Sequence, residues 1–174
     1  FDTINSFSDK RIKYFLNEKN LGLAASLNRG IHFAKGKYIL RMDDDDIAVE
    51  DRIKTQVNFM EENEMIGICG SWVTFFGDKK FIWKATELHE NIICRHFLNT
   101  AMAHPSIIIR KSTLIENNLF FNEKYRRAQD YDFFMRAAKS VRLHNIQRSL
   151  LLYRVHDTKQ QKIDNHIIAL KTLK

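Results

Sequence analysis

Cysteine, proline and glycine are all scarce in this chain of 174 residues, which contains two, one and six of them respectively. The two cysteines, Cys69 and Cys94, form no Cys-x-x-Cys pair, which excludes a zinc ribbon, an iron–sulfur protein and a disulfide scaffold. The single proline and few glycines exclude a collagen-like or linker-rich chain. No apolar run approaches the roughly 20 residues of a membrane-spanning helix. We therefore expect a globular domain in a reducing compartment, which favours a cytoplasmic location.

Positive charge is unevenly distributed along the chain, whose net charge is +7. Residues 124–174 hold 12 basic and 4 acidic residues, whereas residues 1–123 hold 16 and 17. This basic region is either a solvated tail or a surface for a polyanion. No signature of a nucleic-acid-binding fold is present, so we expect no nucleic-acid partner. A diphosphate, or peripheral contact with the anionic inner face of the plasma membrane, suits the charge better.

Apolar periodicity predicts that strands and helices alternate in the first half of the chain. The expected helices cover 23–34, with Gly36 as C-cap, then 49–60, 88–98, 112–118 and 130–140. The expected strands cover 12–16, 37–42, 66–76, 81–83, 106–110, 141–146 and 150–155. Alternation of this kind is typical of a parallel α/β sheet, and the second half is mixed.

Four consecutive aspartates, Asp43 to Asp46, follow the strand predicted over 37–42 and precede a helix. Such a run is often a solvated loop. In an open α/β sheet, however, ligands bind at the carboxyl ends of the strands. Crowded carboxylates there are readily stabilised by Mg²⁺ or Mn²⁺, which also bridge to substrate phosphates. In an extended segment Asp43 and Asp45 would point the same way and Asp44 the opposite way, so a D-x-D pair can share one metal–diphosphate site.

This region resembles the D-x-D region of family-2 glycosyltransferases. The matching stretch is K-Y-I-L-R-M-D-D-D-D-I, followed by a helix that carries Arg52 and Gln56. Further segments resemble the same family in the same order: N-L-G-L-A-A-S-L-N-R-G-I (20–31), I-G-I-C-G-S-W-V (66–73), H-P-S-I-I-I-R-K-S (104–112), R-A-Q-D-Y-D-F-F-M-R (127–136) and Y-R-V-H (153–156). The likeness covers roughly residues 10–160.

The resemblance implies a GT-A-like, Rossmann-like α/β fold, with a mostly parallel central sheet flanked by helices and a mixed carboxy-terminal part. The expected domain covers 1–160, and a helical tail follows over 161–174. Members of this family begin with two strands that have no counterpart here, so the resemblance implies an amino-terminally truncated domain.

The resemblance also implies a donor site and a metal site. The residues that it assigns to the nucleotide-sugar are Asn20, Gly22, Asn28, Arg29, Asp43, Asp44 and Asp45. In many members an Arg stands where this chain has Leu27, and Arg29 is its expected substitute. Asp45, Asp43 and His156 are the expected ligands of Mn²⁺ or Mg²⁺.

On the acceptor side, the resemblance makes Asp130 the general base that takes the proton of the acceptor hydroxyl. Gln129 stands where the family usually has Glu. Asp132 is the competing base, and its alternative role is a helix cap or a pair with Arg136 at i+4. His104 is expected on the acceptor side or as a structural residue at a strand entry. Trp72 and Trp83 suit the core better than a sugar platform.

The function implied is an inverting, metal-dependent transfer of a sugar from a nucleotide-diphosphate donor, with UDP-sugar favoured. The expected acceptor is a glycan or a lipid-linked molecule, in the synthesis of a bacterial-type surface polysaccharide. One alternative is a metal-dependent nucleotidyltransferase, although no glycine-rich phosphate loop is present. The second alternative is a truncated, non-catalytic domain of the same family.

Overall fold

The computed structural model describes residue 4 and residues 6–155 of the chain. The helices are α2 (Leu23–Phe33), α3 (Arg52–Glu62), α4 (His89–His96), α5 (Lys111–Glu116) and α6 (Gln129–Ala137), and a 3₁₀ turn, η1, covers His104–Ser106. The strands are β1 (Tyr38–Leu40), β2 (Ile47–Ala48), β3 (Ile66–Gly77), β4 (Phe81–Trp83), β5 (Ile108–Arg110) and β6 (Arg142–Val155). His156 and the helical tail predicted over 161–174 lie outside the described residues.

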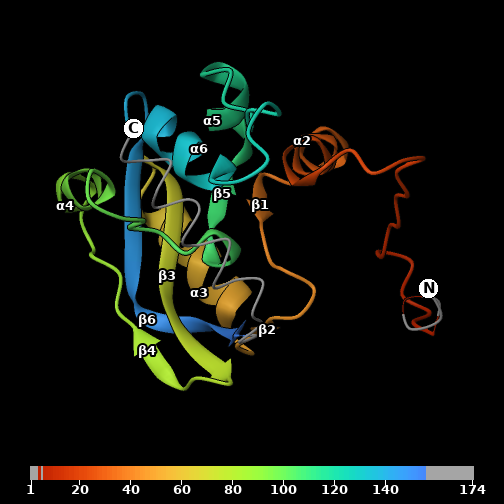
Figure 1. The fold of residues 1–174 in the computed structure, drawn as a ribbon, viewed down its shortest axis with the longest axis horizontal. Helices are drawn as coiled ribbons and strands as arrows, with labels where there is room; N and C mark the ends of the chain where they lie inside the picture. The colour runs from red at the N-terminus through yellow and green to blue at the C-terminus, as the bar shows by residue number, and fades with distance from the viewer. Residues whose placement is uncertain (1–3, 5, 156–174) are drawn as a thin grey trace.

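The six strands form one mixed sheet in the order β1-β5-β3-β6-β2, and β4 pairs with the distal half of β3. The long strands β3 and β6 run side by side through its centre (Figure 1). The predicted α/β class is thus confirmed, but a mostly parallel sheet is not seen in the described part, where β3–β6 is the one parallel pair. A parallel pair needs a long connection, and the one between β3 and β6 contains α4, α5 and α6. An antiparallel pair needs only a tight turn, which joins β3 to β4. Alternation in the sequence does not reveal which strands become neighbours.

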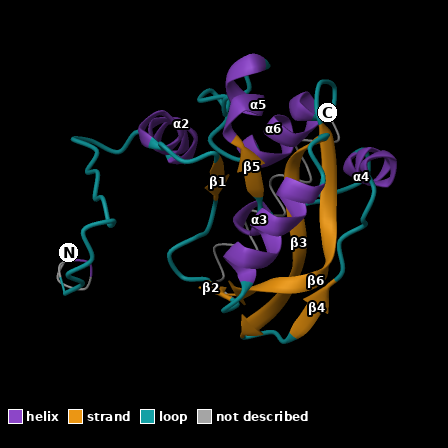
Figure 2. Cartoon of the chain, turned by 180° about the vertical axis from the view of Figure 1, so that it is seen from behind, coloured by secondary structure: helices purple, strands orange, loops and turns teal. Residues whose placement is uncertain are grey.

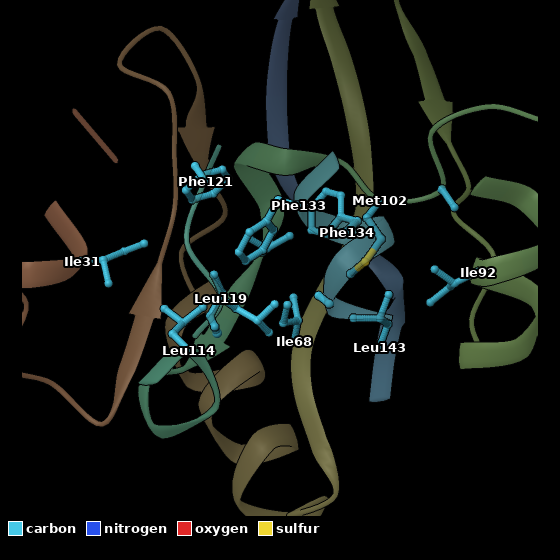
Figure 3. Close-up of a cluster of buried hydrophobic side chains, with 14 of the residues drawn as sticks. Ile31, Ile68, Ile92, Met102, Leu114, Leu119, Phe121, Phe133, Phe134 and Leu143 are labelled. Carbon is cyan, nitrogen blue, oxygen red and sulfur yellow. The ribbon is translucent and has the colours of Figure 1, made fainter. Parts of the chain in front are cut away.

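Side chains of β3 and β5 alternate between two apolar layers, as the two-residue period of a strand requires. Ile68 and Ile109 face one cluster, whereas Cys69 and Ile108 face the other, together with Met60 of α3. Helix α3 covers the second face of the sheet (Figure 2). Side chains from α2, α4, α5 and α6 converge in the first cluster (Figure 3). No helix in the described part is both long and apolar enough to cross a bilayer.

The strand predicted over 12–16 is wrong, because this segment is irregular and pairs with no described strand. This segment leads into α2 and lies outside the sheet (Figure 1). Its Phe15 ring instead stacks on Phe33 of α2, with centroids 4.2 Å apart. Helix α2 itself is confirmed, but it ends at Phe33 with Ala34 as an extended C-cap, so Gly36 is not the cap.

Two further expectations differ from the structure. The two strands predicted over 141–146 and 150–155 are one strand, β6. Its pairing with β3 shifts register at Trp72, which lets the pairing continue through the polar residues 147–149. In α3 the apolar positions predicted to form the buried face are buried only in part, because Ile53 is 64% exposed whereas Val57 and Met60 pack in the second cluster. The buried face of α3 carries Arg52, Gln56 and Met60, since carbonyl groups of the surrounding segments satisfy the two polar side chains.

Candidate active site

One cavity of about 380 Å³ brings together residues that the sequence places far apart. Four of the predicted site residues line it, namely Asp43, His104, Gln129 and Asp130. Its apolar wall is built by the β3–β4 hairpin and β6, through Val73, Phe75, Trp83 and Tyr153. Trp83 therefore borders this cavity, whereas the indole of Trp72 donates to the Ala85 carbonyl oxygen at 3.0 Å. The cavity has a polar end at the acidic run and an aromatic wall.

The acidic run forms a turn rather than the extended segment that we expected. The amide of Asp46 donates to the Asp43 carbonyl oxygen at 3.4 Å, and Asp44 and Asp45 occupy the corner. Asp44 is exposed and Asp45 is half-buried, and neither lines the cavity. Of the D-x-D pair, the structure thus places only Asp43 in the cavity wall.

Asp46 is the buried member of the run, and the sequence analysis did not single it out. Asp46 is only 8% exposed. Its Oδ1 accepts the Arg154 amide at 2.9 Å, while its buried Oδ2 has no hydrogen-bond partner in the described part of the chain. Burial raises the pKa of Asp46 above its usual value, and the nearby Asp43 and Asp45 raise it further. The Arg154 side chain also donates to the Asp45 carbonyl oxygen at 3.0 Å, so β6 holds the turn in place.

Arg41 is the second residue that the sequence analysis missed. Its guanidinium forms two hydrogen bonds with the Asp43 carboxylate, one of them 2.7 Å long, and its side chain is only 9% exposed. Both residues line the cavity. Residues two apart on an extended chain point the same way, so the spacing of Arg41 and Asp43 was the available signal. The pair puts one cation beside the carboxylates at the polar end.

The first turn of α6 supplies the residues predicted on the acceptor side. Asp130 is half-buried in the cavity wall beside the buried Gln129. Asp132 does not line the cavity and instead accepts a 2.9 Å hydrogen bond from Arg136 at i+4. The residue before the helix, Ala128, adopts the left-handed conformation with φ of 56°, which is uncommon for a residue with a Cβ atom. Strain of this kind is typical of functional sites.

His104 opens η1 and is buried in the cavity wall, and its Nε2 atom has no hydrogen-bond partner among the residues that the structure describes. Its ring packs against Phe121 and Phe134, at centroid distances of 5.2 and 6.1 Å. Burial, helped by the charge of Arg41, lowers the pKa of His104 to about 3. The imidazole is therefore neutral at physiological pH, and it cannot serve there as a cationic contact for a phosphate.

A buried polar cluster ties the two sides of the cavity together. Arg52, 2% exposed, donates to the carbonyl oxygens of Arg41 at 2.8 Å and Pro105 at 2.9 Å, and to the Gln56 side chain at 2.9 Å. Gln56 in turn donates to the Ser106 carbonyl oxygen at 2.8 Å. Desolvation lowers the pKa of Arg52 to about 10, so it stays protonated at neutral pH. Arg52 thereby fixes the backbone that leads into the acidic turn against η1.

Apart from Asp43, which lines the cavity, the residues predicted at the nucleotide lie outside it, and four of them, Asn20, Gly22, Asn28 and Arg29, belong to α2 or its entry. Asn20 accepts the Gly22 amide at 2.9 Å and so shapes the entry to α2, where Gly22 has φ of 81°. Both line a neighbouring pocket of about 630 Å³, which shares Leu23 with the cavity. Asn28 instead binds the backbone of Phe121 through both its amide atoms, and Arg29 bonds to Asn17. The described fold thus engages Asn28 and Arg29 in packing α2.

The neutral, buried His104 predicts a loss of stability in acid. In the unfolded chain it would titrate near pH 6.5, whereas in the fold it stays unprotonated down to about pH 3. The stabilisation is therefore complete above pH 6.5 and is lost as the pH falls towards 3. At pH 5 we expect the free energy of unfolding to be about 2 kcal/mol smaller than at pH 7 on account of this group. Urea unfolding at both pH values measures it.

His104→Gln should remove this part of the pH dependence, and His32→Gln, at an exposed position on α2, is the matched control. His96, with no exposed surface and a pKa that burial also lowers, adds to the slope in the same direction and remains in both variants. An unchanged slope in His104→Gln would contradict the prediction.

Comparison with known proteins places this chain in a family. The profile described as glycosyl transferase family 2 matches residues 2–138. An uncharacterized glycosyltransferase of Methanocaldococcus jannaschii is 35% identical over 171 residues, which are 95% of this chain and 57% of that protein. The Escherichia coli UDP-Gal:α-D-GlcNAc-diphosphoundecaprenol β-1,3-galactosyltransferase is 32% identical over 146 residues, 80% of this chain and 52% of that protein. The chain thus spans little more than half the length of these relatives.

Solved structures agree on the fold. The crystal structure of Staphylococcus aureus TarS residues 1–349 with UDP superposes with a TM-score of 0.66 at 19% identity, over 80% of this chain and 42% of that one. The same protein with UDP-GlcNAc gives a TM-score of 0.65 at 18% identity, over 81% and 41%. The mixed sheet described above is accordingly of the GT-A type. The family profile covers most of the sequence and both sides of the cavity, and this chain belongs to glycosyl transferase family 2.

Proposed function

We propose that this chain carries the reaction centre of a metal-dependent, inverting glycosyltransferase. The observation that carries the proposal is the single cavity that joins Asp43 of the acidic turn to Asp130 of α6. Transfer of a sugar from a diphosphate needs both a place that tolerates the departing negative charge and a base for the acceptor. Two carboxylates on different elements of one cavity can supply these two places, because Asp43 lies beside Arg41 at the polar end and Asp130 lines the same cavity from α6.

The acidic turn suits a hard divalent cation, Mn²⁺ or Mg²⁺. Among the described residues no three His, Cys, Asp or Glu side chains already form a metal-binding group. The donors that the acidic turn itself offers are nevertheless all carboxylate oxygens, and the buried Oδ2 of Asp46, which has no hydrogen-bond partner among the described residues, adds to the negative potential there. Asp43 and Asp45 would hold the ion, with His156 as a proposed third ligand. When bound, it would stabilise negative charge on the leaving diphosphate.

The chain's own residues then perform the acceptor half of the reaction. Asp130 accepts the proton of the acceptor hydroxyl as that oxygen forms a bond with the anomeric carbon. The bond between that carbon and the diphosphate oxygen breaks with its electron pair, which leaves a nucleoside diphosphate. Attack from the face opposite the leaving group inverts the anomeric configuration, and no covalent intermediate forms. Gln129 and His104, both buried and uncharged, border the acceptor without competing for its proton.

Relatives support the substrate classes that we propose. The TarS structures were solved with UDP and UDP-GlcNAc, and the E. coli relative is named for UDP-Gal and a diphosphoundecaprenol acceptor. We therefore propose a UDP-sugar donor and a lipid-linked or glycan acceptor, in the synthesis of a surface polysaccharide. Asn20 and Gly22 are the proposed contacts on the donor side beyond Leu23, with Asp44 at the corner of the turn. Asn28 and Arg29 would support α2 there.

The identity of the released product tests the proposal. With a UDP-sugar, Mn²⁺ and an undecaprenyl-diphosphate-linked acceptor, the protein should release UDP in step with consumption of the acceptor. Release of pyrophosphate would instead show a nucleotidyltransferase. If the protein shows no turnover and also no calorimetric binding of the donor, the proposal is overturned in favour of a non-catalytic domain.

Removing one carboxylate from the acidic turn tests the metal site. In the unaltered protein, EDTA should weaken calorimetric binding of UDP by at least about tenfold, because the ion bridges the turn to the phosphates. Asp45→Ala should bind UDP weakly with or without EDTA. Glu50→Gln, at an exposed carboxylate five residues after Asp45, is the matched control and should keep the full effect of EDTA. Equal metal dependence in Asp45→Ala would contradict the assignment.

A further inference from the structure

The tip of the β3–β4 hairpin is an exposed surface that the reaction does not explain. Residues 77–82 and Lys84 are all exposed, and Phe81 and Ile82 keep 49% and 53% of their surface accessible. Successive residues of a strand point to opposite faces, so both faces of the hairpin present a large apolar side chain. We call the hairpin patch the set formed by Phe81, Ile82, Lys79, Lys80 and Lys84. An exposed apolar edge strand is usually protected or covered.

The charge of the hairpin patch is positive. Residues 77–84 contain three lysines and a single carboxylate, that of Asp78. Within the part of the chain that the structure describes, none of these three ammonium groups forms an ion pair. The Lys84 ammonium lies 5.1 Å from the centre of the Trp72 ring, which holds it beside the strand. Apolar side chains flanked by unpaired lysines are the composition that binds an anionic lipid surface.

An aromatic track connects the hairpin patch with the cavity. The Phe81 ring stacks on Phe75, with centroids 4.3 Å apart, and Phe75 lies 4.9 Å from the Tyr153 ring. Phe75 and Tyr153 both line the cavity, as does Trp83, which directly follows Ile82. A molecule with its apolar part at the hairpin would therefore meet a row of aromatic rings leading into the cavity that Asp130 lines. Such an arrangement suits an amphiphile whose polar end reacts.

We propose that the hairpin patch docks this protein on an anionic bilayer, with Phe81 and Ile82 in the interface and the lysines at the lipid phosphates. Only the identity of the molecule that enters the aromatic track rests on the proposed function. Under that function, the track would receive a lipid-linked acceptor directly from the membrane. A second protein is a weaker occupant. Two apolar residues at the end of a narrow ribbon offer far less than the roughly 800 Å² that each partner buries in a stable interface, whereas a bilayer needs only shallow insertion.

Sedimentation with vesicles, in the absence of donor and acceptor, tests the docking. The protein should bind phosphatidylglycerol–phosphatidylcholine vesicles and not pure phosphatidylcholine vesicles, and salt should weaken the binding. The variant Lys79→Gln/Lys80→Gln/Lys84→Gln and the variant Phe81→Ser/Ile82→Ser should each lose at least about tenfold in partitioning, in keeping with the attraction of several lysines to anionic lipid. Matched controls are Lys139→Gln and Ile115→Ser, both exposed near α5 and α6, at the far end of the molecule from β4 (Figure 1).

Tryptophan fluorescence identifies the contact. In the variant Trp72→Phe, Trp83 is the sole tryptophan, and brominated anionic lipid should quench it. Vesicle binding without quenching would place the contact elsewhere and overturn the proposal, as would the absence of binding to anionic vesicles. Self-association that the Phe81→Ser/Ile82→Ser change abolishes, without vesicle binding, would show instead an interface between two copies. Because these vesicle assays contain no donor or acceptor, their outcome and the outcome of the product assay are independent of each other.

Discussion

Asparagine at position 130 is expected to reduce sugar transfer by roughly 10²–10⁴-fold while binding of the nucleotide stays unchanged. The amide keeps the size of the Asp130 side chain but cannot accept the proton of the acceptor hydroxyl. Donor binding should be spared, because the proposed site of the diphosphate lies at the polar end of the cavity, beside Asp43 and Arg41, whereas Asp130 lies on α6. The turnover number measured with donor and acceptor at saturation should fall, and calorimetric affinity for UDP should not.

Asp132→Asn is the matched control, because it makes the same chemical change two residues further along the same helical turn. Asp132 does not line the cavity and is already engaged with Arg136. The control should lose only the half-exposed pair at i+4, about 0.5 kcal/mol of stability or less, and retain transfer. The reverse result, loss in Asp132→Asn and retention in Asp130→Asn, would transfer the role of base to Asp132. Retention in both would contradict a carboxylate base on α6.

The position of α6 explains why such a base would be well oriented. The Tyr131 hydroxyl donates to the His96 carbonyl oxygen at 2.6 Å, which anchors the first turn of α6 on the end of α4. Phe133 and Phe134 are fully buried in the first apolar cluster (Figure 3). The strained Ala128 lies outside these contacts, so packing of the helix supplies the energy that holds it. Asp130 therefore projects from a fixed turn rather than from a mobile loop.

Local periodicity predicted the elements that bury one clear apolar face. Helix α2 and the strands β3 and β4 are confirmed within a few residues, because Leu27, Ile31 and the run from Ile66 follow the periods of a helix and a strand. Periodicity failed at Arg52, where a charged residue is buried because three acceptors surround it. It failed at 12–16 because a strand needs a partner, which a local pattern does not show.

The candidate site likewise contains residues that the sequence selected and residues that it did not. Resemblance of short motifs selected Asp43, His104, Gln129 and Asp130, and the fold brings these four together. It did not select Asp46 or Arg41, whose importance comes from burial and from an ion pair across the turn. The role of the hairpin patch depends on exposure and on contact with Phe75, which only the folded chain defines. Short motifs thus predicted which residues lie together in the cavity, whereas they did not predict the effects of burial on charge.

Arg52→Met is expected to lower the free energy of unfolding by about 3 kcal/mol, measured in urea. Methionine fills similar space but leaves the carbonyl oxygens of Arg41 and Pro105 and the Gln56 side chain without their donor, inside the protein. Arg52→Lys should recover only part of the loss, because an ammonium cannot reproduce the planar arrangement of donors that reaches three separate acceptors. Arg148→Met removes an exposed ion pair with Asp51 and is the matched control, with an expected loss below about 1 kcal/mol.

The same substitution should also disturb the cavity, because Arg52 joins the segment before the acidic turn to η1. Where Arg52→Lys still folds, affinity for UDP with Mn²⁺ should fall, since Arg41 and Asp43 lose the fixed backbone that aims them into the cavity. The Arg148→Met protein should bind UDP as the unaltered protein does. Stability within 1 kcal/mol of the unaltered protein in Arg52→Met would mean that the surrounding carbonyls find other donors. The link between the two walls of the cavity would then lie elsewhere than in this buried guanidinium.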